Sequence, residues 1–472
     1  MLNDFFLEKT KENFPFELTG EQLHALERWS IFLFDRNNDS IFLMKGYAGT
    51  GKSSLVGTIV KTLNELKQKS VLLAPTGRAA KVFSIYSEQN AYTIHKKIYR
   101  QKEFSNDPTG FVLADNLYKH TLFIVDEASM ISNSGMDASF FGSGRLLDDL
   151  IRYVYSGEGC RLALLGDSAQ LPPVSQPESP ALDVSVLQGY GLHVYSLTLT
   201  EVVRQAKSSS ILMNATQLRK KLETGRTAVF PKISLNNNPD VQTVSGSDLI
   251  EAIQDACQRD GWEETIVITR SNKRANGFNN AIRNQILYCE DELTAGDMLM
   301  VVKNNYHWAK QEESMEFIAN GDLMKIRRVR RIQELYGFRF CDVTASFPDY
   351  ETELDLKILL DTLHTDAPAL PKELSDQLFN AIMEDYADIP QKREKMKLIR
   401  ENPFYNVVQV KYAYAVTCHK AQGGQWKNVF LDLSYIPPEQ VGVDFYRWLY
   451  TAFTRATERL FLINPVKELV AK

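Results

Sequence analysis

Residues 46–53 read GYAGTGKS and combine the residue types that bind phosphate groups through backbone amides. The stretch fits the pattern GxxxxGK[ST] directly after the apolar run IFLMK and ahead of a helical stretch, which is the context that the pattern requires. Glycines let the amides turn toward phosphate oxygens, while Lys52 would reach the β- and γ-phosphates and Ser53 would ligate Mg²⁺. We therefore predict nucleotide contacts for Gly46, Tyr47, Ala48, Gly49, Thr50, Gly51, Lys52, Ser53 and Ser54. A chance glycine-rich turn is disfavoured because both the context and the Lys-Ser pair match.

Two adjacent acids, Asp126 and Glu127, end the apolar run LFIV. A phosphate-binding enzyme of this kind needs a metal-holding carboxylate at the end of a neighbouring strand, so we assign Asp126, together with Ser53, to Mg²⁺. Glu127 would then orient or deprotonate the attacking water. The pair favours hydrolysis over transfer to an acceptor, since the sequence identifies no acceptor site. The alternative is an ordinary solvated strand end.

Three polar residues farther along the chain could contact the γ-phosphate. Gln170, in LLGDSAQLPPV, follows another strand, where an amide can sense phosphate without competing as a base. Arg204 and Arg455 lie in or next to a second group of strands. Arginines that reach the γ-phosphate from a second core would make nucleotide binding close the cleft between the cores.

These residues follow short apolar strands that alternate with helical stretches. SIFLMKG, SVLLAP, TLFIVDE and RLALLGD each end in a turn or an acid, which is typical of a parallel sheet whose strand ends carry chemistry. A second series, TIVITR, VFLDLS and RLFLINP, predicts a second α/β sheet. Between them, KIRRVRRIQ and FRFCDVTASF look like antiparallel strands, and SDQLFNAIMEDYADI and QKREKMKLIREN look helical. This change of rhythm, from about residue 323 to 408, indicates a small inserted domain.

The overall charge argues against a general electrostatic grip on nucleic acid. The net charge is −5 and the pI is near 5.9, so a polyanion would be held by local patches. Residues 76–102 form one such basic patch, and four aromatic residues are interleaved with it: Phe83, Tyr86, Tyr92 and Tyr99. Their rings could stack on bases, although aromatics of an α/β domain more often lie in the core. A basic run, comprising Lys325, Arg327, Arg328, Arg330 and Arg331, could contact DNA or could be a solvated strand face.

The spacing of the cysteines and the length of the apolar runs indicate the cellular compartment of the protein. Five cysteines lie far apart with no CxxC, so we expect neither disulfides nor a structural metal, and a reducing cytoplasm fits best. The N-terminus lacks a basic start followed by an apolar run, and no stretch of 18 uncharged apolar residues occurs. We therefore expect a cytoplasmic protein that is neither exported nor membrane-spanning.

An ordered series of motifs resembles the superfamily 1 helicases, closest to the RecD/Dda type that moves 5′ to 3′ on single-stranded DNA. The series is LTGEQ, GYAGTGKSS, APTGRAAK, TIH, VDEAS, GDSAQLPPV, LTEVVRQ, YAVTCHKAQGGQW and WLYTAFTRA. It runs over nearly the whole chain in the family's order and spacing. Several of these motifs would be weak singly, whereas the ordered series is highly specific.

The resemblance implies ATP and Mg²⁺ as cofactors and a role for each matching residue. In the nucleotide site, Gln22 matches the residue that reads adenine, Gln170 the sensor, and Arg204 and Arg455 the arginine fingers. Residues that match those holding the DNA strand are Thr76, Arg78, Thr93 and His95 on the first core and Thr417, His419 and Lys420 on the second. Gln422 and its glycines would link the second grip to the nucleotide cleft. Gln425 stands where many relatives carry a ribose-facing Glu, which leaves a ribose contact in doubt.

The resemblance also implies an α/β fold with two RecA-like P-loop cores. We expect the first core in residues 1–199 and the second in 200–322 and 409–472, with an SH3-like β domain carrying a helical excursion at 323–408. A small β-hairpin, the pin, is expected at about 98–118, with the turn-rich SNDPTG between Phe104 and Phe111. These two rings could wedge a duplex apart, or they could form a cross-strand pair that only stabilises the hairpin.

The function that the resemblance implies is that of a monomeric, ATP-dependent DNA helicase. Its partners would be single-stranded DNA and duplex junctions, with transient contacts to single-strand-binding, repair or replication proteins. Two alternatives remain open: an RNA helicase of the same superfamily, and a nucleic-acid-binding ATPase switch that does not unwind. Larger RecD-type proteins carry an N-terminal extension, whereas about 17 residues precede LTGEQ here, so we expect a stand-alone motor.

Overall fold

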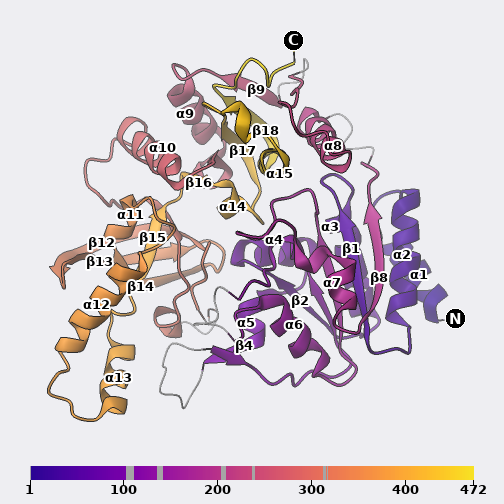
Figure 1. The fold of residues 1–472 in the computed structure, drawn as a ribbon, viewed down its shortest axis with the longest axis horizontal. Helices are drawn as coiled ribbons and strands as arrows, with labels where there is room; N and C mark the ends of the chain where they lie inside the picture. The colour runs from indigo at the N-terminus through magenta and orange to yellow at the C-terminus, as the bar shows by residue number, and fades with distance from the viewer. Residues whose placement is uncertain are drawn as a thin grey trace.

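The computed structural model describes residues 2–101, 111–135, 142–203, 209–235, 240–311, 315 and 317–471. Two of the predicted site residues, Phe104 and Arg204, lie outside these ranges. Two parallel sheets and a β-barrel make up the described part of the chain, and Figure 1 shows the second sheet above the first, with the barrel to the left of both. No helix among the described residues is long and apolar enough to cross a membrane.

The first core is a six-stranded sheet in the order β3-β2-β6-β7-β1-β8, and every neighbouring pair is parallel. Its strands are β1 (Ser40–Gly46), β2 (Ser70–Ala74), β3 (Ala91–Thr93), β6 (Leu122–Val125), β7 (Arg161–Gly166) and β8 (His193–Leu199). Its helices are α1 (Leu2–Asn13), α2 (Gly20–Leu33), α3 (Lys52–Glu65), α4 (Gly77–Ser87), α5 (Ile94–Ile98), α6 (Leu146–Tyr155) and α7 (Val184–Gln188). The four strands predicted here from the sequence are confirmed.

The apolar run of β1 is continuous because helices cover both faces of this sheet. Phe42 points to one face and packs on Trp29 of α2, with ring centroids 4.3 Å apart. Its neighbours Ile41 and Leu43 point to the other face and pack in the cluster that contains Leu150 of α6. A strand buried on both faces can hold its carboxyl end rigidly, and that end carries the phosphate-binding loop.

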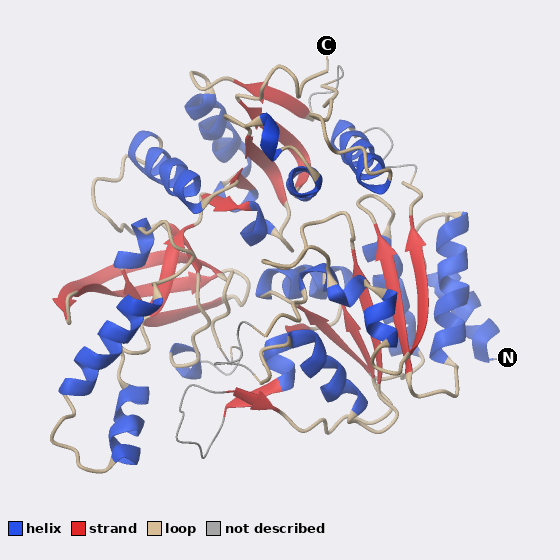
Figure 2. Cartoon of the chain, viewed as in Figure 1, coloured by secondary structure: helices blue, strands red, loops and turns tan. Residues whose placement is uncertain are grey.

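The second core is a five-stranded parallel sheet in the order β16-β10-β17-β18-β9, seen above the first in Figure 2. Its strands are β9 (Val241–Val244), β10 (Thr265–Thr269), β16 (Ala415–Thr417), β17 (Trp426–Asp432) and β18 (Ala456–Ile463). Its helices are α8 (Ser210–Glu223), α9 (Leu249–Asp260), α10 (Asn272–Gln285), α14 (Cys418–Ala421) and α15 (Val443–Phe453). The three predicted strands of this series are confirmed as well.

A closed barrel of five strands stands beside the two sheets. It is formed by β11 (Met298–Val301), β12 (Leu323–Leu335), β13 (Phe338–Phe347), β14 (Thr352–Leu359) and β15 (Val408–Tyr412), and α11 (Asp361–His364), α12 (Lys372–Glu384) and α13 (Lys392–Glu401) follow β14. The predicted antiparallel pair is β12 with β13. The barrel includes residues outside the predicted segment 323–408. Its strand β11 precedes that segment, and β15 continues past the end of it.

The basic run on β12 meets acids of the neighbouring barrel strand. Arg327 Nε lies 3.2 Å from a carboxylate oxygen of Glu353, and Arg330 Nη2 lies 2.6 Å from one of Asp355. All four side chains are about half exposed. This arrangement favours the solvated strand face over a DNA contact for these two arginines.

The flanks of the predicted pin form a two-stranded antiparallel ladder, β4 (Tyr99–Gln101) with β5 (Phe111–Leu113). Phe111 lies opposite Gln101 and packs on Tyr306, with ring centroids 4.3 Å apart. Phe111 therefore sits in the ladder pair nearest the tip, against a loop that precedes β12. The tip, residues 102–110, lies outside the described residues, as does Phe104.

Candidate active site and nucleic-acid interface

The phosphate-binding loop joins β1 to α3. Gly51 caps α3 with φ of +75°, and Gly49 has φ of +76°, a region that residues with a Cβ rarely enter. A Cβ on Gly51 would lie 2.5 Å from Nε2 of Gln22. Because glycine has no capping side chain, the first amides of α3 can donate to an anion at the positive end of the helix.

Lys52, the first residue of α3, points at the acid that follows β6, the strand that lies beyond β7 from β1. Its Nζ lies 3.6 Å from Oδ1 of Asp126, and both side chains are almost fully buried. Burial alone would lower the pKa of Lys52, but Asp126, Glu127 and Asp167 together raise it. Lys52 therefore stays cationic, while its contact with phosphate oxygens stays a prediction.

Glu127, the next residue, is partly buried and has a left-handed backbone, with φ of 53°. Its Oε2 has no hydrogen-bond partner among the described residues. Burial raises the pKa of Glu127, and the positive charges of Lys52 and Arg455 oppose that rise. A buried carboxylate oxygen without a donor and with a raised pKa is suited to accept a proton from water.

The loop after β7, residues 167–171, is bound by the second core. Tyr450 of α15 donates its hydroxyl to Oδ2 of Asp167 at 2.6 Å, and the Ala48 amide of the phosphate-binding loop donates to the same hydroxyl at 3.0 Å. The Leu171 amide donates to Oγ1 of Thr451 at 2.9 Å. The Leu171 carbonyl accepts from Nε2 of Gln422 at 2.9 Å. The predicted link between Gln422 and the nucleotide cleft is therefore a direct hydrogen bond.

Gln170 lies inside this loop and is buried. Within the described part of the chain, no group pairs with its Oε1. An amide held there can still turn its nitrogen toward a phosphate oxygen, which suits the predicted sensor.

Arg455 is brought to the same cleft from the C-terminal end of α15. Its guanidinium is buried and donates to the carbonyls of Gly424 and Thr451, each at 3.1 Å. Burial raises the pKa of Asp167, and the charge of Arg455 is among the interactions that oppose this rise. The structure thus places Arg455 near the acids of the first core, bonded to its own core.

Two predicted nucleotide contacts, Gln22 and Gln425, have partners within the protein. Gln22 is buried, donates Nε2 to the Thr50 carbonyl at 3.0 Å and accepts from the Thr19 amide at 3.0 Å. It therefore supports the phosphate-binding loop, while its adenine contact stays a prediction. Gln425 has an exposed side chain, and its carbonyl accepts from Arg78 Nη2 at 3.1 Å.

The first predicted strand grip lies at two helix N-termini. The hydroxyls of Thr76 and Thr93 accept from the amides of the first turns of α4 and α5, each at 3.2 Å, which leaves their hydrogens available to a phosphate. Arg78 lies over the ring of Trp426 in the second core, 4.1 Å from its centroid. Burial lowers the pKa of His95 to about 4, so its imidazole ring is neutral at pH 7. The predicted contact with DNA would therefore be made by a neutral ring.

The second predicted grip surrounds α14, which begins after Thr417. His419 is exposed, whereas Nζ of Lys420 is buried and pairs with no group among the described residues. Burial and the neighbouring Lys411 lower the pKa of Lys420 to about 8. A phosphate oxygen would supply the anion that this ammonium group lacks.

The two grips meet at one turn of the second core. Gly423 has φ of +74°, and a Cβ on it would lie 2.8 Å from Cβ of Ala79 in α4. Only glycine fits both the left-handed backbone and the close approach. The turn after α14 thus rests directly on the helix that carries Thr76 and Arg78.

Sequence reasoning missed three residues of the cleft: Tyr86, Asp167 and Tyr450. Tyr86 donates its hydroxyl to Oδ2 of Asp126, so stacking of its ring on bases is not supported. Phe83 is fully buried. It is therefore a core residue, which was the alternative to base stacking that the sequence left open. Asp167 ends β7 as Asp126 ends β6, and this repeated strand-end acid was the available signal. Tyr450 lies within a quoted motif, but no pattern marks its hydroxyl.

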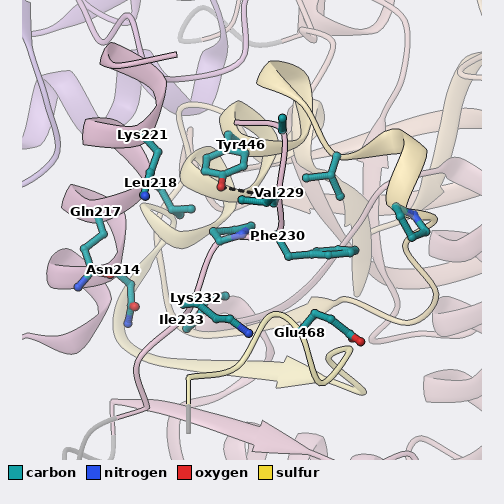
Figure 3. A pocket seen from close by; sticks show the side chains of 14 residues that line it. Asn214, Gln217, Leu218, Lys221, Val229, Phe230, Lys232, Ile233, Tyr446 and Glu468 are labelled. Carbon is teal, nitrogen blue, oxygen red and sulfur yellow. Dashed lines mark hydrogen bonds between the residues drawn. The ribbon is translucent and has the colours of Figure 1, made fainter. Parts of the chain in front are cut away.

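A separate cavity of about 580 Å³ lies in the second core, between α8 and α15 (Figure 3). Tyr446 lines it and donates its hydroxyl to the Val229 carbonyl at 2.8 Å. None of the predicted site residues lines this cavity, so it is distinct from the nucleotide cleft.

Comparisons with known proteins agree with the order of the motifs. Residues 17–232 match the family model of an AAA domain, and residues 412–463 match that of a UvrD-like helicase C-terminal domain. The uncharacterized protein R530 of Acanthamoeba polyphaga mimivirus is 24% identical, over 94% of this chain and 99% of its own. The ATP-dependent RecD2 DNA helicase of Deinococcus radiodurans is 23% identical over 89% of this chain, which spans only 46% of that protein. A crystal structure of the Pif1 helicase from Bacteroides aligns with 97% of this chain and 95% of that chain, at 14% identity and a TM-score of 0.46.

The two family models divide between the two cores. The AAA model spans the phosphate-binding loop, Asp126 and Gln170, and the UvrD-like model spans His419, Gln422 and Arg455. The alignment with the RecD2 relative covers 89% of this chain, so the similarity extends over both cores. Across both cores, the chain is similar to the superfamily 1 helicases of the RecD type.

Proposed function

We propose that this ATP-dependent DNA helicase moves 5′ to 3′ along single-stranded DNA and separates the duplex ahead of it. The observation that carries the proposal is the shared cleft. Lys52, Asp126 and Glu127 come from the first core, and Tyr450, Gln422 and Arg455 reach the same place from the second. A nucleotide site shared in this way can convert hydrolysis into relative movement of two cores.

The residues at the strand ends fit ATP and Mg²⁺. Two possible metal ligands lie near the first turn of α3, the carboxylate of Asp126 and the hydroxyl of Ser53. Both offer oxygen atoms, which Mg²⁺ prefers as ligands. Asp126 and Ser53 would hold Mg²⁺, whose charge would offset that of the phosphates. Lys52 and the α3 amides would hold the phosphates, and Glu127 would take the proton of the attacking water.

Gln170 and Arg455 give the site its dependence on both cores. Gln170 would contact the γ-phosphate, and the loop that holds it is bonded to Tyr450, Thr451 and Gln422 of the second core. Arg455, with Arg204, would approach the γ-phosphate as an arginine finger. Binding of ATP would then draw the cores together, and hydrolysis would release them.

Movement would follow from two grips on the strand that tighten in turn. Thr76, Arg78, Thr93 and His95 form the first grip, and Thr417, His419 and Lys420 form the second. Gly423 lies close to Ala79 of α4, so this turn would be one place where a change in the distance between the grips alters a contact. Base pairs would break at the pin expected at about 98–118, in front of the moving strand.

The architecture proposed with this function has two RecA-like cores and an SH3-like barrel with a helical excursion. We place the protein in the cytoplasm, as a monomer, which suits its five free thiols. Its partners would be single-stranded DNA, duplex junctions, and transiently the proteins of repair or replication.

An unwinding assay with 5′-tailed and 3′-tailed DNA duplexes tests the proposal. We expect ATP-dependent separation of the 5′-tailed duplex only, and none by Lys52→Ala, which serves as the matched control. ATP hydrolysis stimulated by single-stranded DNA should exceed that with RNA of the same sequence. Unwinding of the 3′-tailed duplex alone would refute the direction, and stronger stimulation by RNA would refute the substrate. Strand-stimulated hydrolysis without unwinding of either duplex would leave only the ATPase switch.

A further inference from the structure

Helix α4 connects the two sites that a helicase must couple. It begins at Gly77, directly after the predicted strand contact Thr76, and ends at Ser87. Its eleven helical residues span about 16 Å. A displacement of the residues at one end of α4 can therefore be transmitted to the other end through one rigid helix.

The C-terminal end of α4 touches the acid assigned to Mg²⁺. The Tyr86 hydroxyl donates to Oδ2 of Asp126, while Oδ1 accepts from the Glu127 amide at 2.8 Å and lies 3.6 Å from Lys52 Nζ. Both oxygens of this carboxylate are therefore engaged, and the tyrosine fixes one of them. The Tyr86 ring cannot swing freely, because it stacks on the fully buried Phe83 with centroids 5.1 Å apart.

The same end of α4 is pressed against the helix of the phosphate-binding loop. A Cβ on Gly57 of α3 would lie 2.3 Å from the carbonyl oxygen of Tyr86. Backbone packed this closely leaves no room for the last turn of α4 to tilt alone. A shift of α4 would thus reach the Tyr86 hydroxyl, and through it Asp126.

The N-terminal end of α4 is held by the second core and the barrel. Arg78 lies on Trp426 and donates to the Gln425 carbonyl, and Gly423 abuts Ala79. From the barrel, Asp349 lies 3.0 Å from Nζ of Lys81. Closure of the cores, or a strand bound at Thr76 and Arg78, would act on this end first.

We propose that Tyr86 is a positioning residue that couples occupancy of the strand site to the Asp126 carboxylate. The inference rests on the proposed function, since it concerns how bound DNA stimulates ATP hydrolysis. Tyr86 does not react. Its hydroxyl sets the orientation of Asp126, and α4 carries the movement of the strand grip to that hydroxyl.

The variant Tyr86→Phe tests this directly because it removes the hydroxyl and keeps the ring. Tyr195→Phe is the matched control, since Tyr195 also donates to a carboxylate of the first core, Asp35 Oδ2 at 3.0 Å. We expect Tyr86→Phe to lower the stimulation of kcat by single-stranded DNA on the order of tenfold, as for a hydrogen bond to a charged group. The KM for ATP and the Kd for single-stranded DNA should change less than about twofold, and Tyr195→Phe should match the wild type in all three.

A binding measurement adds a readout that does not depend on turnover. The affinity of fluorescent N-methylanthraniloyl-ADP is compared in Mg²⁺ and in EDTA, with and without single-stranded DNA. In the wild type and in Tyr195→Phe, the strand should change the part of the affinity that depends on Mg²⁺. In Tyr86→Phe, that change should disappear.

Several outcomes would overturn the inference. Unchanged stimulation in Tyr86→Phe would do so and leave the proposed function standing, provided that the wild type is stimulated and unwinds. A parallel fall in strand affinity, or loss of cooperative thermal unfolding, would assign the hydroxyl a purely structural role. A wild type that neither responds to single-stranded DNA nor unwinds would remove the inference and the proposed function together.

Discussion

Asp322 provides a test of the contact between the barrel and α4. Its carboxyl is buried at this contact, and no cation among the described residues is bonded to it. It accepts from the Ala319 amide at 2.7 Å and from the Tyr350 hydroxyl at 3.2 Å. A Cβ on Gly77 would lie 2.3 Å from its Oδ1, so the carboxyl stands against the first turn of α4. Burial raises the pKa of Asp322 from 3.8 to about 7, and the nearby Asp349 adds to the rise.

The raised pKa makes stability depend on pH in a defined direction. Below pH 3.8, Asp322 is protonated in the folded and the unfolded chain and contributes nothing. Between pH 3.8 and about 7, only the folded chain keeps the proton, so the free energy of unfolding falls as pH rises. The slope is about 1.4 kcal/mol per pH unit, and the full loss, reached above pH 7, is about 4 kcal/mol.

The variant Asp322→Asn should remove this loss, because an amide has no charge to bury. We expect it to be more stable than the wild type at pH 8 by up to about 4 kcal/mol, with a difference that shrinks steadily toward pH 4. Thermal unfolding between pH 5 and pH 8 measures the effect. The control is Asp355→Asn on the exposed face of the same barrel, where hydrogen bonds from Thr344 and Arg330 lower the pKa of the native carboxyl. A constant difference between Asp322→Asn and wild type across this range would refute the reasoning.

Three further predictions concern the site itself. Lys52→Ala should abolish ATP hydrolysis while single-strand binding, followed by fluorescence anisotropy, stays measurable; unchanged turnover would mean that the phosphate site lies elsewhere. Glu127→Gln should lower kcat on the order of 10²- to 10⁴-fold and trap bound ATP, as judged by nucleotide retained after rapid gel filtration. A wild-type rate in that variant would exclude Glu127 as the base. The double variant His419→Ala, Lys420→Ala should weaken single-strand binding and reduce its salt dependence, whereas impaired ATP affinity with an unchanged salt slope would reverse the assignment.

The sequence predicted the parts of this structure that depend on short stretches of chain. The run IFLMK, followed by GYAGTGKS, specifies a buried strand, a glycine turn and a helix start within about a dozen residues, and β1, the loop and α3 are where the pattern put them. Asp126 and Glu127 were identified for the same reason, since acids after an apolar strand are a local signal. The antiparallel pair β12 and β13 was found from its alternating residues.

The contacts that were missed join residues far apart in the chain. Closure of the barrel by β11 and β15 depends on pairing across the helical excursion, with Val301 opposite Val410. Tyr86 was weighed as a base-stacking or core residue, but its hydroxyl meets Asp126, 40 residues away. Tyr450 and Asp167 are 283 residues apart. No spacing rule links such positions, because the fold alone brings them together.

The loop at residues 167–171 joins the first core to the second at the place where we propose that ATP binds. Both backbone groups of Leu171 are bonded to the second core, the amide to Thr451 and the carbonyl to Gln422. Gln170, one residue earlier, therefore cannot move toward a γ-phosphate without pulling on α15 and on the turn after α14. That turn packs against Ala79 of α4, and near the C-terminal end of α4 the Tyr86 hydroxyl donates to Asp126. These contacts connect the proposed phosphate site to the proposed strand grip, and we therefore expect a change at one site to affect the other.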